Sequence, residues 1–282
     1  METNLLIAIT NLVKDPIVNL VSHYRSANRA NSMGDALEFY VKDLFCGSLH
    51  ENSLAKKNEI YSKYFSYIGN QNNPPDIIIK DGDAIEVKKI ESLRSGIALN
   101  SSYPKDKLFS DSPMITSECR ACENWREKDL VYAIGVSTDG KLKALWLVYG
   151  DCYAASKEIY ERVRDKISKG INELPDVEFA ETNELGRVNK VDPLGITYLR
   201  IRGMWGIENP IKVFSYVAPI DSDAEFSVNA IMAKEKYLSF PEKDRKGIEK
   251  LASSNFSIKD IKIKSPNNPA KLLDAKLLSF TK

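Results

Sequence analysis

The chain has 282 residues, of which 43% are hydrophobic and 28% are charged, and its formal net charge is +1. This is the composition of an ordinary globular protein, and it excludes a disordered chain. No run of eighteen apolar residues is present and the N-terminus lacks a signal-peptide pattern, so we expect a cytoplasmic protein without a membrane partner.

The N-terminal region predicts helices. Asp15 followed by Pro16 has the residue types of an N-cap and a first helical position, and this pair should divide the apolar N-terminal stretch into two short helices. Ser32, with Asp35 three residues further on, forms a capping-box pattern that opens another helix. That helix carries a continuous apolar stripe made of Leu37, Tyr40, Val41, Leu44 and Phe45.

A β-hairpin is predicted next. Residues 76–80 are largely β-branched and apolar after their first position, and residues 84–88 alternate in character. Between them, Asp81-Gly82 is a strong turn signal. The three segments therefore predict two antiparallel strands joined by a tight turn.

This hairpin collects the residues that carry chemistry. Because side chains alternate along a strand, Glu86 and Lys88 share one face while Ile85 and Val87 take the core. Counting back across the turn puts Asp76 opposite Glu86. The two carboxylates should then lie close enough to hold one divalent ion.

Further strands and a helix are predicted downstream. Residues 130–136 and 142–149 are strand-like and flank Asp139-Gly140, which has turn chemistry. Residues 156–169 predict an amphipathic helix packed on a sheet, with Gly170 as its C-cap. The apolar positions of this helix, four residues apart, are Ile159, Val163 and Ile167.

The order of these elements predicts an α/β fold in one domain, residues 1–282. The nearest thing to a boundary is the polar region at residues 220–223. Residues 241–282 hold ten Lys or Arg against five Asp or Glu, so we expect residues 220–282 to form a basic C-terminal elaboration. A basic face is compatible with DNA binding, and it is equally compatible with a terminus that only improves solubility.

The order Asp76 and Glu86-Val87-Lys88 matches the PD-(D/E)xK signature of metal-dependent nucleases. Across most of residues 1 to about 215, the chain resembles the NgoPII-type type II restriction endonucleases. The matching segments are residues 29–31, 69–76, 86–89, 99–105, 145–150, 175–179 and 191–196. The resemblance implies a restriction-endonuclease-like core, with a central mixed β-sheet flanked by helices, and site-specific cleavage of double-stranded DNA.

Hydrolysis of a phosphodiester needs a nucleophilic water and neutralisation of the charge that develops, both of which Mg²⁺ supplies. We expect Asp76 and Glu86 to bind Mg²⁺ with the Val87 carbonyl as a third protein ligand. Lys88 should orient the attacking water or help to deprotonate it. The resemblance adds products with 5′-phosphate and 3′-hydroxyl ends. It also adds Glu38, on the helix before the hairpin, as a further catalytic acid, and the alternative for Glu38 is a solvated helix charge.

DNA sequence is read mainly in the major groove, where arginine pairs with guanine. The resemblance implies the palindrome GGCC, and Arg200 and Arg202, which share one side of a strand, are natural readers of its guanines. Alternatively, these arginines are structural and pair with acids such as Asp192 or Glu208. A polar loop after the catalytic strand offers further DNA contacts through Asn100, Ser101, Ser102, Tyr103 and Lys105.

A palindromic target has two-fold symmetry, and cutting both strands needs two active sites, so we expect a homodimer. The chain contains no G-x-x-x-x-G-K-[ST] loop, so no nucleotide cofactor is expected. We expect the cutting half of a bacterial restriction-modification system. Two other functions stay open: a PD-(D/E)xK repair nuclease that reads DNA structure, and a DNA-binding protein that does not cleave.

Overall fold

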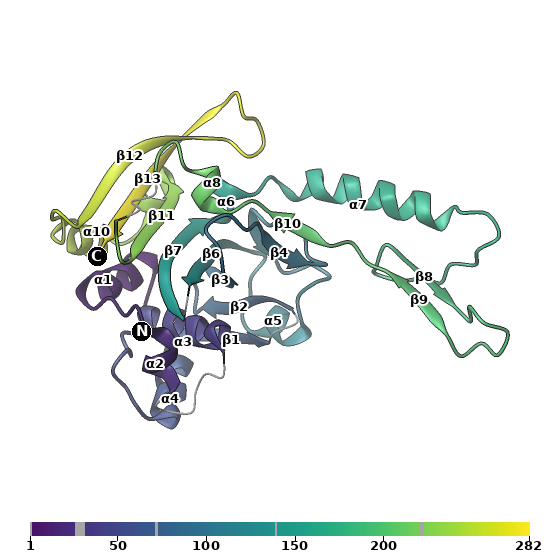
Figure 1. Ribbon diagram of the computed structural model, residues 1–282, viewed down its shortest axis with the longest axis horizontal. Coiled ribbons are helices and arrows are strands. Elements are labelled where there is room, and N and C mark those ends of the chain that lie inside the picture. The colour runs from purple at the N-terminus through teal and green to yellow at the C-terminus, as the bar shows by residue number, and fades with distance from the viewer. Residues whose placement is uncertain (1, 26–31, 71–72, 139, 220–222) are drawn as a thin grey trace.

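The computed structural model describes residues 2–25, 32–70, 73–138, 140–219 and 223–282. Asp139 of the second predicted turn, residues 220–222 of the polar boundary, and residues 29–31 and 71–72 of the matching segments lie outside these ranges. A central mixed sheet with strand order β1-β2-β3-β6-β7-β11-β13-β12 carries the fold (Figure 1). The pairs β3–β6 and β7–β11 are parallel and the other pairs along this path are antiparallel. The predicted α/β fold is confirmed.

The strands of this sheet are β1 (Phe65–Asn70), β2 (Asn73–Ile79), β3 (Ala84–Ile90), β6 (Glu127–Thr138), β7 (Lys141–Tyr149), β11 (Ser227–Ala233), β12 (Phe256–Lys264) and β13 (Leu272–Thr281), and β5 (Lys107–Phe109) pairs with β6. Two short pairs lie outside it: β4 (Ile97–Asn100) with β10 (Trp205–Ile207), and β8 (Gly186–Asn189) with β9 (Tyr198–Ile201).

The helices are α1 (Leu5–Lys14), α2 (Leu20–Arg25), α3 (Met33–Cys46), α4 (Leu54–Tyr64), α5 (Ser117–Ala121), α6 (Gly150–Tyr153), α7 (Lys157–Asn172), α8 (Pro210–Val213), α9 (Lys234–Ser239) and α10 (Glu242–Glu249). Within the described ranges, none of them combines the length and the apolar character needed to cross a lipid bilayer.

Both faces of the sheet are covered because its central strands are apolar on both sides. Along β6, Val131 and Ala133 belong to a core shared with α1 and α3, while Tyr132 and Ile134 belong to a second core shared with α6 and α8. This alternation follows from the two-residue period of a strand. The sheet is therefore the middle layer of the molecule.

Helix α3 forms as predicted. The Ser32 side chain accepts a hydrogen bond from the Asp35 backbone N–H at 3.2 Å, and the Asp35 carboxylate accepts one from the Ser32 N–H at 3.2 Å, which completes the capping box. The predicted apolar stripe is buried in the first core. Helix α3 also packs against β3, which brings it to the strand of the predicted site.

The N-terminal region contains two short helices, but Asp15-Pro16 does not open the second. Asp15 is the C-cap of α1, and α2 begins only at Leu20. The Asn19 side chain accepts a hydrogen bond from the Ser22 N–H at 3.2 Å. Asn19, and not Asp15, therefore provides the acceptor for a backbone N–H in the first turn of α2. The predicted N-cap role of Asp15 is therefore wrong, because the fixed φ of Pro16 serves the connection between the helices.

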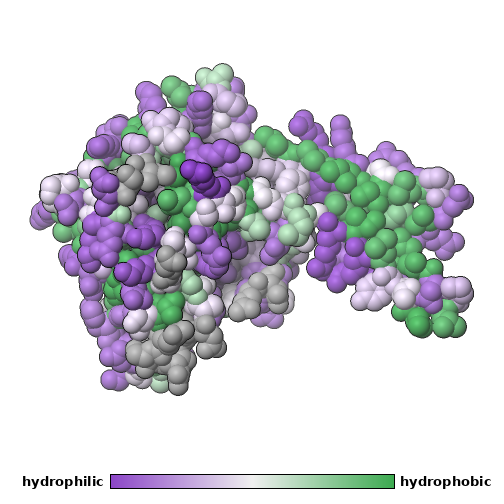
Figure 2. Space-filling view, in the orientation of Figure 1, coloured by the Kyte–Doolittle hydropathy of each residue, from purple (hydrophilic) through white to green (hydrophobic). Residues whose placement is uncertain are grey.

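Residues 157–204 project from the body of the molecule, and we call this segment the arm (Figure 1). It consists of α7 and the β8–β9 hairpin, and hydrophobic residues gather along it in Figure 2. None of the residues of α7 is buried, and the helix continues through Gly170 to Asn172. The predicted end at Gly170 is therefore wrong. The sheet that α7 contacts is the two-stranded β8–β9 pair of the arm, and Tyr160 of α7 also stacks on Tyr103, outside the arm.

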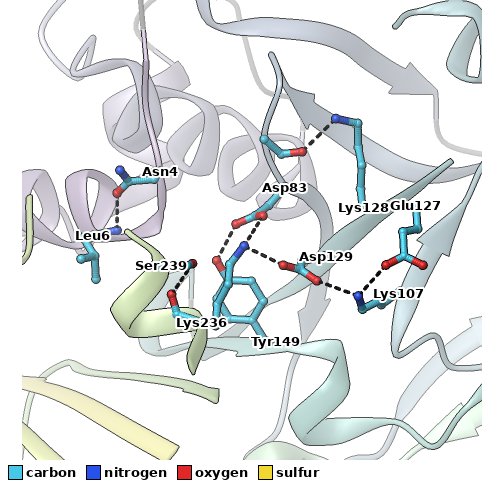
Figure 3. A network of polar contacts seen from close by, with 11 residues as sticks. Asn4, Leu6, Asp83, Lys107, Glu127, Lys128, Asp129, Tyr149, Lys236 and Ser239 are labelled. Carbon is cyan, nitrogen blue, oxygen red and sulfur yellow. Dashed lines mark hydrogen bonds and ion pairs between the residues drawn. The ribbon is translucent and has the colours of Figure 1, made fainter. Parts of the chain in front are cut away.

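The C-terminal residues extend the central sheet, with β11 lying between β7 and β13. From α9, the Lys236 Nζ lies 2.6 Å from Asp83 Oδ1 and 2.7 Å from Asp129 Oδ2 (Figure 3). The Tyr149 hydroxyl donates to the other oxygen of Asp83. Burial lowers the pKa of Lys236, but the two carboxylates more than offset this and leave it above its ordinary value. This network ties the C-terminal part of the chain to the start of β3.

Candidate active site

The predicted hairpin forms from β2 and β3 and places Asp76 beside Glu86. Ile77 pairs with Ile85 in antiparallel register, and one further step of this register puts Asp76 opposite Glu86. The Asp76 Oδ2 accepts a hydrogen bond from the Val87 N–H at 2.6 Å. This bond fixes the first carboxylate against the strand that carries the second.

The two carboxylates share a poorly solvated setting with one lysine. The Lys88 Nζ lies 2.6 Å from Glu86 Oε1, while Glu86 Oε2 is buried without a hydrogen-bond partner among the described residues. Burial, and next the charge of Glu86, raise the pKa of Asp76 to about 8. Burial lowers the pKa of Lys88, but the two carboxylates more than offset this and leave it above its ordinary value. Such a site gains from a bound cation, because the acids lack sufficient compensation within the protein.

The chemistry of these donors suits a hard divalent cation. Asp76 and Glu86 offer carboxylate oxygens, and one oxygen of Glu86 has no protein partner in the described structure. Within the described ranges, no three His, Cys, Asp or Glu side chains form a ready cluster around one point. Waters, a backbone carbonyl or a bound phosphate would have to complete the shell, as is usual for Mg²⁺.

Glu38 lies on α3 within electrostatic reach of the acidic pair. Its negative charge contributes to the raised pKa of Asp76, after burial and the charge of Glu86. The Glu38 carboxylate also pairs with Lys42, one helical turn further on, at 2.9 Å. Glu38 therefore has one structural partner and faces the region of the site.

A cleft of about 670 Å³ joins the acidic pair to the predicted DNA-contact segments. The predicted residues that line it are Asp76, Glu86, Lys88, Asn100, Ser101, Ser102, Arg200 and Arg202. The cleft thus lies between the hairpin, the loop after β4 and the base of the arm, and the fold brings together residues that lie more than a hundred positions apart in the sequence.

Tyr103 and Lys105 are not among the residues that line this cleft. Tyr103 stacks on Tyr160 of α7 with ring centroids 5.6 Å apart, and its hydroxyl donates to Glu161 at 2.9 Å. Lys105 is buried and its Nζ donates to the Ser102 hydroxyl. Burial lowers the pKa of Lys105 to about 8, although the charge of Glu86 opposes the shift. Both side chains support the loop and the arm from behind the cleft.

Arg200 and Arg202 both pair with Glu184. The Arg200 Nη2 lies 2.6 Å from Glu184 Oε1, and the Arg202 Nε contacts the same oxygen. The hydrogen bond from Arg200 is the largest of the effects that lower the pKa of Glu184 to about 2. The two arginines therefore form structural ion pairs, as the alternative expected, but their partner is Glu184. Asp192 instead accepts hydrogen bonds within the hairpin tip, and Glu208 pairs with a lysine of α8.

The comparisons with known proteins identify the family of this chain. The model of the NgoPII restriction endonuclease family matches residues 3–264. The chain belongs to this family. Among curated proteins, the chain is 50% identical over 278 residues to the type II restriction enzyme NgoPII of Neisseria gonorrhoeae, which is 98% of this chain and 99% of that relative. No solved structure gives a significant match.

The family match confirms the resemblance found from the motifs and extends it into the C-terminal part. The structure adds cleft residues that the sequence analysis had not singled out as contacts, among them Asn73, Arg164, Asn183 and Glu184. Asn73 could have been predicted as a cleft residue from its position three residues before Asp76. No sequence feature places Arg164 in the cleft, because the pattern of its helix indicates only packing on a sheet.

Proposed function

We propose that this chain is a Mg²⁺-dependent type II restriction endonuclease. It hydrolyses phosphodiester bonds of double-stranded DNA at a short palindromic site, by resemblance GGCC, and leaves 5′-phosphate and 3′-hydroxyl ends. The observation that carries the proposal is the acidic pair Asp76 and Glu86 beside Lys88, in one cleft with two arginines, in a chain of the NgoPII family.

Asp76 and Glu86 are the side chains that would hold the cation, with the Val87 carbonyl as a further protein ligand. Bound Mg²⁺ supplies a nucleophilic water near neutral pH and neutralises charge on the phosphate. Glu86 Oε2 suits this task because Lys88 occupies only the other oxygen, and because no described residue hydrogen-bonds to Oε2. The Val87 N–H holds the Asp76 carboxylate in position.

Lys88 is assigned to orient the attacking water and to offset phosphate charge. Its ammonium group is held 2.6 Å from Glu86, so it lies beside the carboxylates and carries its proton. This favours a cationic role for Lys88 over the removal of a proton from water. Glu38 adds a third negative charge near the same point and supports cation binding from α3.

Arg200 and Arg202 are assigned to the guanines of the target, and Asn100, Ser101 and Ser102 to neighbouring DNA contacts. In the free protein both arginines contact Glu184, so each must exchange that carboxylate for DNA. Tyr103 and Lys105 act through the loop that they support. A homodimer in the bacterial cytoplasm, with one active site for each strand, completes the proposal.

The test is digestion of a sequenced plasmid by the wild type, Asp76→Asn and Glu91→Gln, with Mg²⁺ or EDTA, followed by sequencing of the fragment ends. Glu91→Gln is the matched control, because this exposed acid lies just beyond β3 and pairs with Lys89. We expect ends at one palindrome, lost in EDTA and in Asp76→Asn and retained in the control. Nicking without a preferred sequence would favour a nuclease that recognises DNA structure. DNA binding without cleavage would show that Asp76 and Glu86 have only a structural role.

A further inference from the structure

The arm exposes as much apolar surface as the largest patches found on ordinary monomers. We define the arm surface as Val163, Ile167, Val191, Leu194, Ile196 and Leu199, which are between 42% and 81% exposed. Figure 2 shows hydrophobic residues gathered along this part of the molecule. Six such side chains leave about 600 Å² in contact with water, which is the upper end for the largest patch on an ordinary monomer.

The helical part of the arm surface lies to one side of the contact between α7 and the hairpin. Ser168 and Asn172 of α7 both hydrogen-bond to the Leu185 carbonyl, at 2.9 and 2.8 Å, so this side of the helix contacts the hairpin. At about 100° of rotation per residue, Val163 and Ile167 lie between about 100° and 180° around the helix from these two residues. They are 42% and 47% exposed, so the arm covers only part of the apolar stripe of α7.

The tip of the hairpin holds two apolar side chains outward in an ordered turn. Asp192 accepts hydrogen bonds from the backbone N–H groups of Leu194, Ile196 and Thr197, at 2.9, 3.1 and 2.7 Å. Leu194 and Ile196 are nevertheless 81% and 74% exposed. A turn that is fixed before binding loses little entropy when its apolar side chains are covered.

Charge and area favour a protein partner over DNA. Residues 157–204 contain nine Lys or Arg and nine Asp or Glu, so the arm as a whole is neutral. Arg200 and Arg202 line the cleft, whereas the arm surface consists of uncharged side chains, which offer phosphates no attraction. A standard interface buries about 800 Å² on each partner, and about 65% of a homodimer interface is apolar, which amounts to about 500 Å². The arm surface supplies that amount.

We propose that the arm surface is the interface through which two copies of this chain form a homodimer. The inference rests on the proposed function for its partner, since a palindrome needs two active sites, and it names the surface that joins them. A two-fold axis lets the same surface of each copy cover the other.

The test is sedimentation velocity of the full chain without DNA, for the wild type, Ile167→Glu, Leu194→Glu and Leu54→Glu. Leu54 is the matched control, because it is 46% exposed on α4, outside the arm, while Ile167 is 47% exposed. We expect a dimeric wild type and control, and a rise of at least about tenfold in the dimer dissociation constant of each arm variant. Circular dichroism checks that all four proteins are folded.

A monomeric wild type, or arm variants that dimerise as well as the wild type, would overturn the inference. Arm variants with an unchanged mass but weaker DNA binding would assign the surface to DNA and would also overturn it. Failure of the proposed function looks different, because a wild type that dimerises through the arm and does not cut DNA loses the function and keeps the interface. A wild type that cuts the palindrome as a monomer keeps the function and loses the interface.

Discussion

Replacing Glu184 by glutamine should strengthen nonspecific DNA binding. In the free protein one carboxylate neutralises one of the two guanidinium charges of Arg200 and Arg202, so this wall of the cleft carries a net charge of +1. Glu184→Gln raises it to +2, and each further phosphate that is neutralised steepens the slope of log affinity against log salt by about 0.9. Between about 50 and 200 mM salt, the affinity of the variant should therefore fall about three- to fourfold more than that of the wild type.

Fluorescence anisotropy with a random-sequence duplex in EDTA measures this slope without cleavage. Glu208→Gln is the matched control, since Glu208 also pairs with a cation, Lys212 at 3.0 Å, but it is not among the residues that line the cleft. We expect tighter binding at low salt and the steeper slope for Glu184→Gln alone. A slope equal to that of the wild type, or an equal change in the control, would refute the assignment of Arg200 and Arg202 to DNA.

Three further predictions concern stability. Lys236→Met leaves Asp83 without its cation and leaves Asp129 with Lys107 alone. It should lower the free energy of unfolding in urea by about 3 kcal/mol, whereas a loss below about 1 kcal/mol would show that solvent already screens the network. Ser32→Ala removes the cap of α3 and should cost about 1 kcal/mol by the same measurement, and no change would mean that water caps the helix equally well. Burial raises the pKa of Asp76 from 3.8 to about 8, so the folded chain binds that proton more tightly than the unfolded chain does. In EDTA, stability should fall as the pH rises between these values, and it should fall less in Asp76→Asn; identical pH profiles would contradict this.

The features that depend on near neighbours were predictable from the sequence. The capping box at Ser32 and Asp35 spans three residues, and the approach of Asp76 to Glu86 follows from a strand period of two and a short turn. The continuous apolar run at residues 130–136 of β6 is typical of a strand that is buried on both faces.

Features that join distant segments were not predictable in this way. An amphipathic pattern shows that one side of α7 is apolar but not which sheet lies beside it, and that sheet is the small β8–β9 pair of the arm. Glu184 lies on an irregular loop, 16 residues before Arg200, and no periodicity connects the two. The pair of Lys236 with Asp83 spans 153 positions of the sequence, for which a pattern carries no signal.

The place of β11 in the sheet bears on how the protein is made. Residues 227–281 supply three adjacent strands of the central sheet, and α9 supplies the lysine that anchors the start of β3. Chains are synthesised from the N-terminus, so Asp76, Glu86 and Lys88 leave the ribosome long before the strands that complete their sheet. A nascent chain therefore carries all three residues without a finished scaffold, and DNA cleavage should begin only when synthesis of the chain is nearly complete.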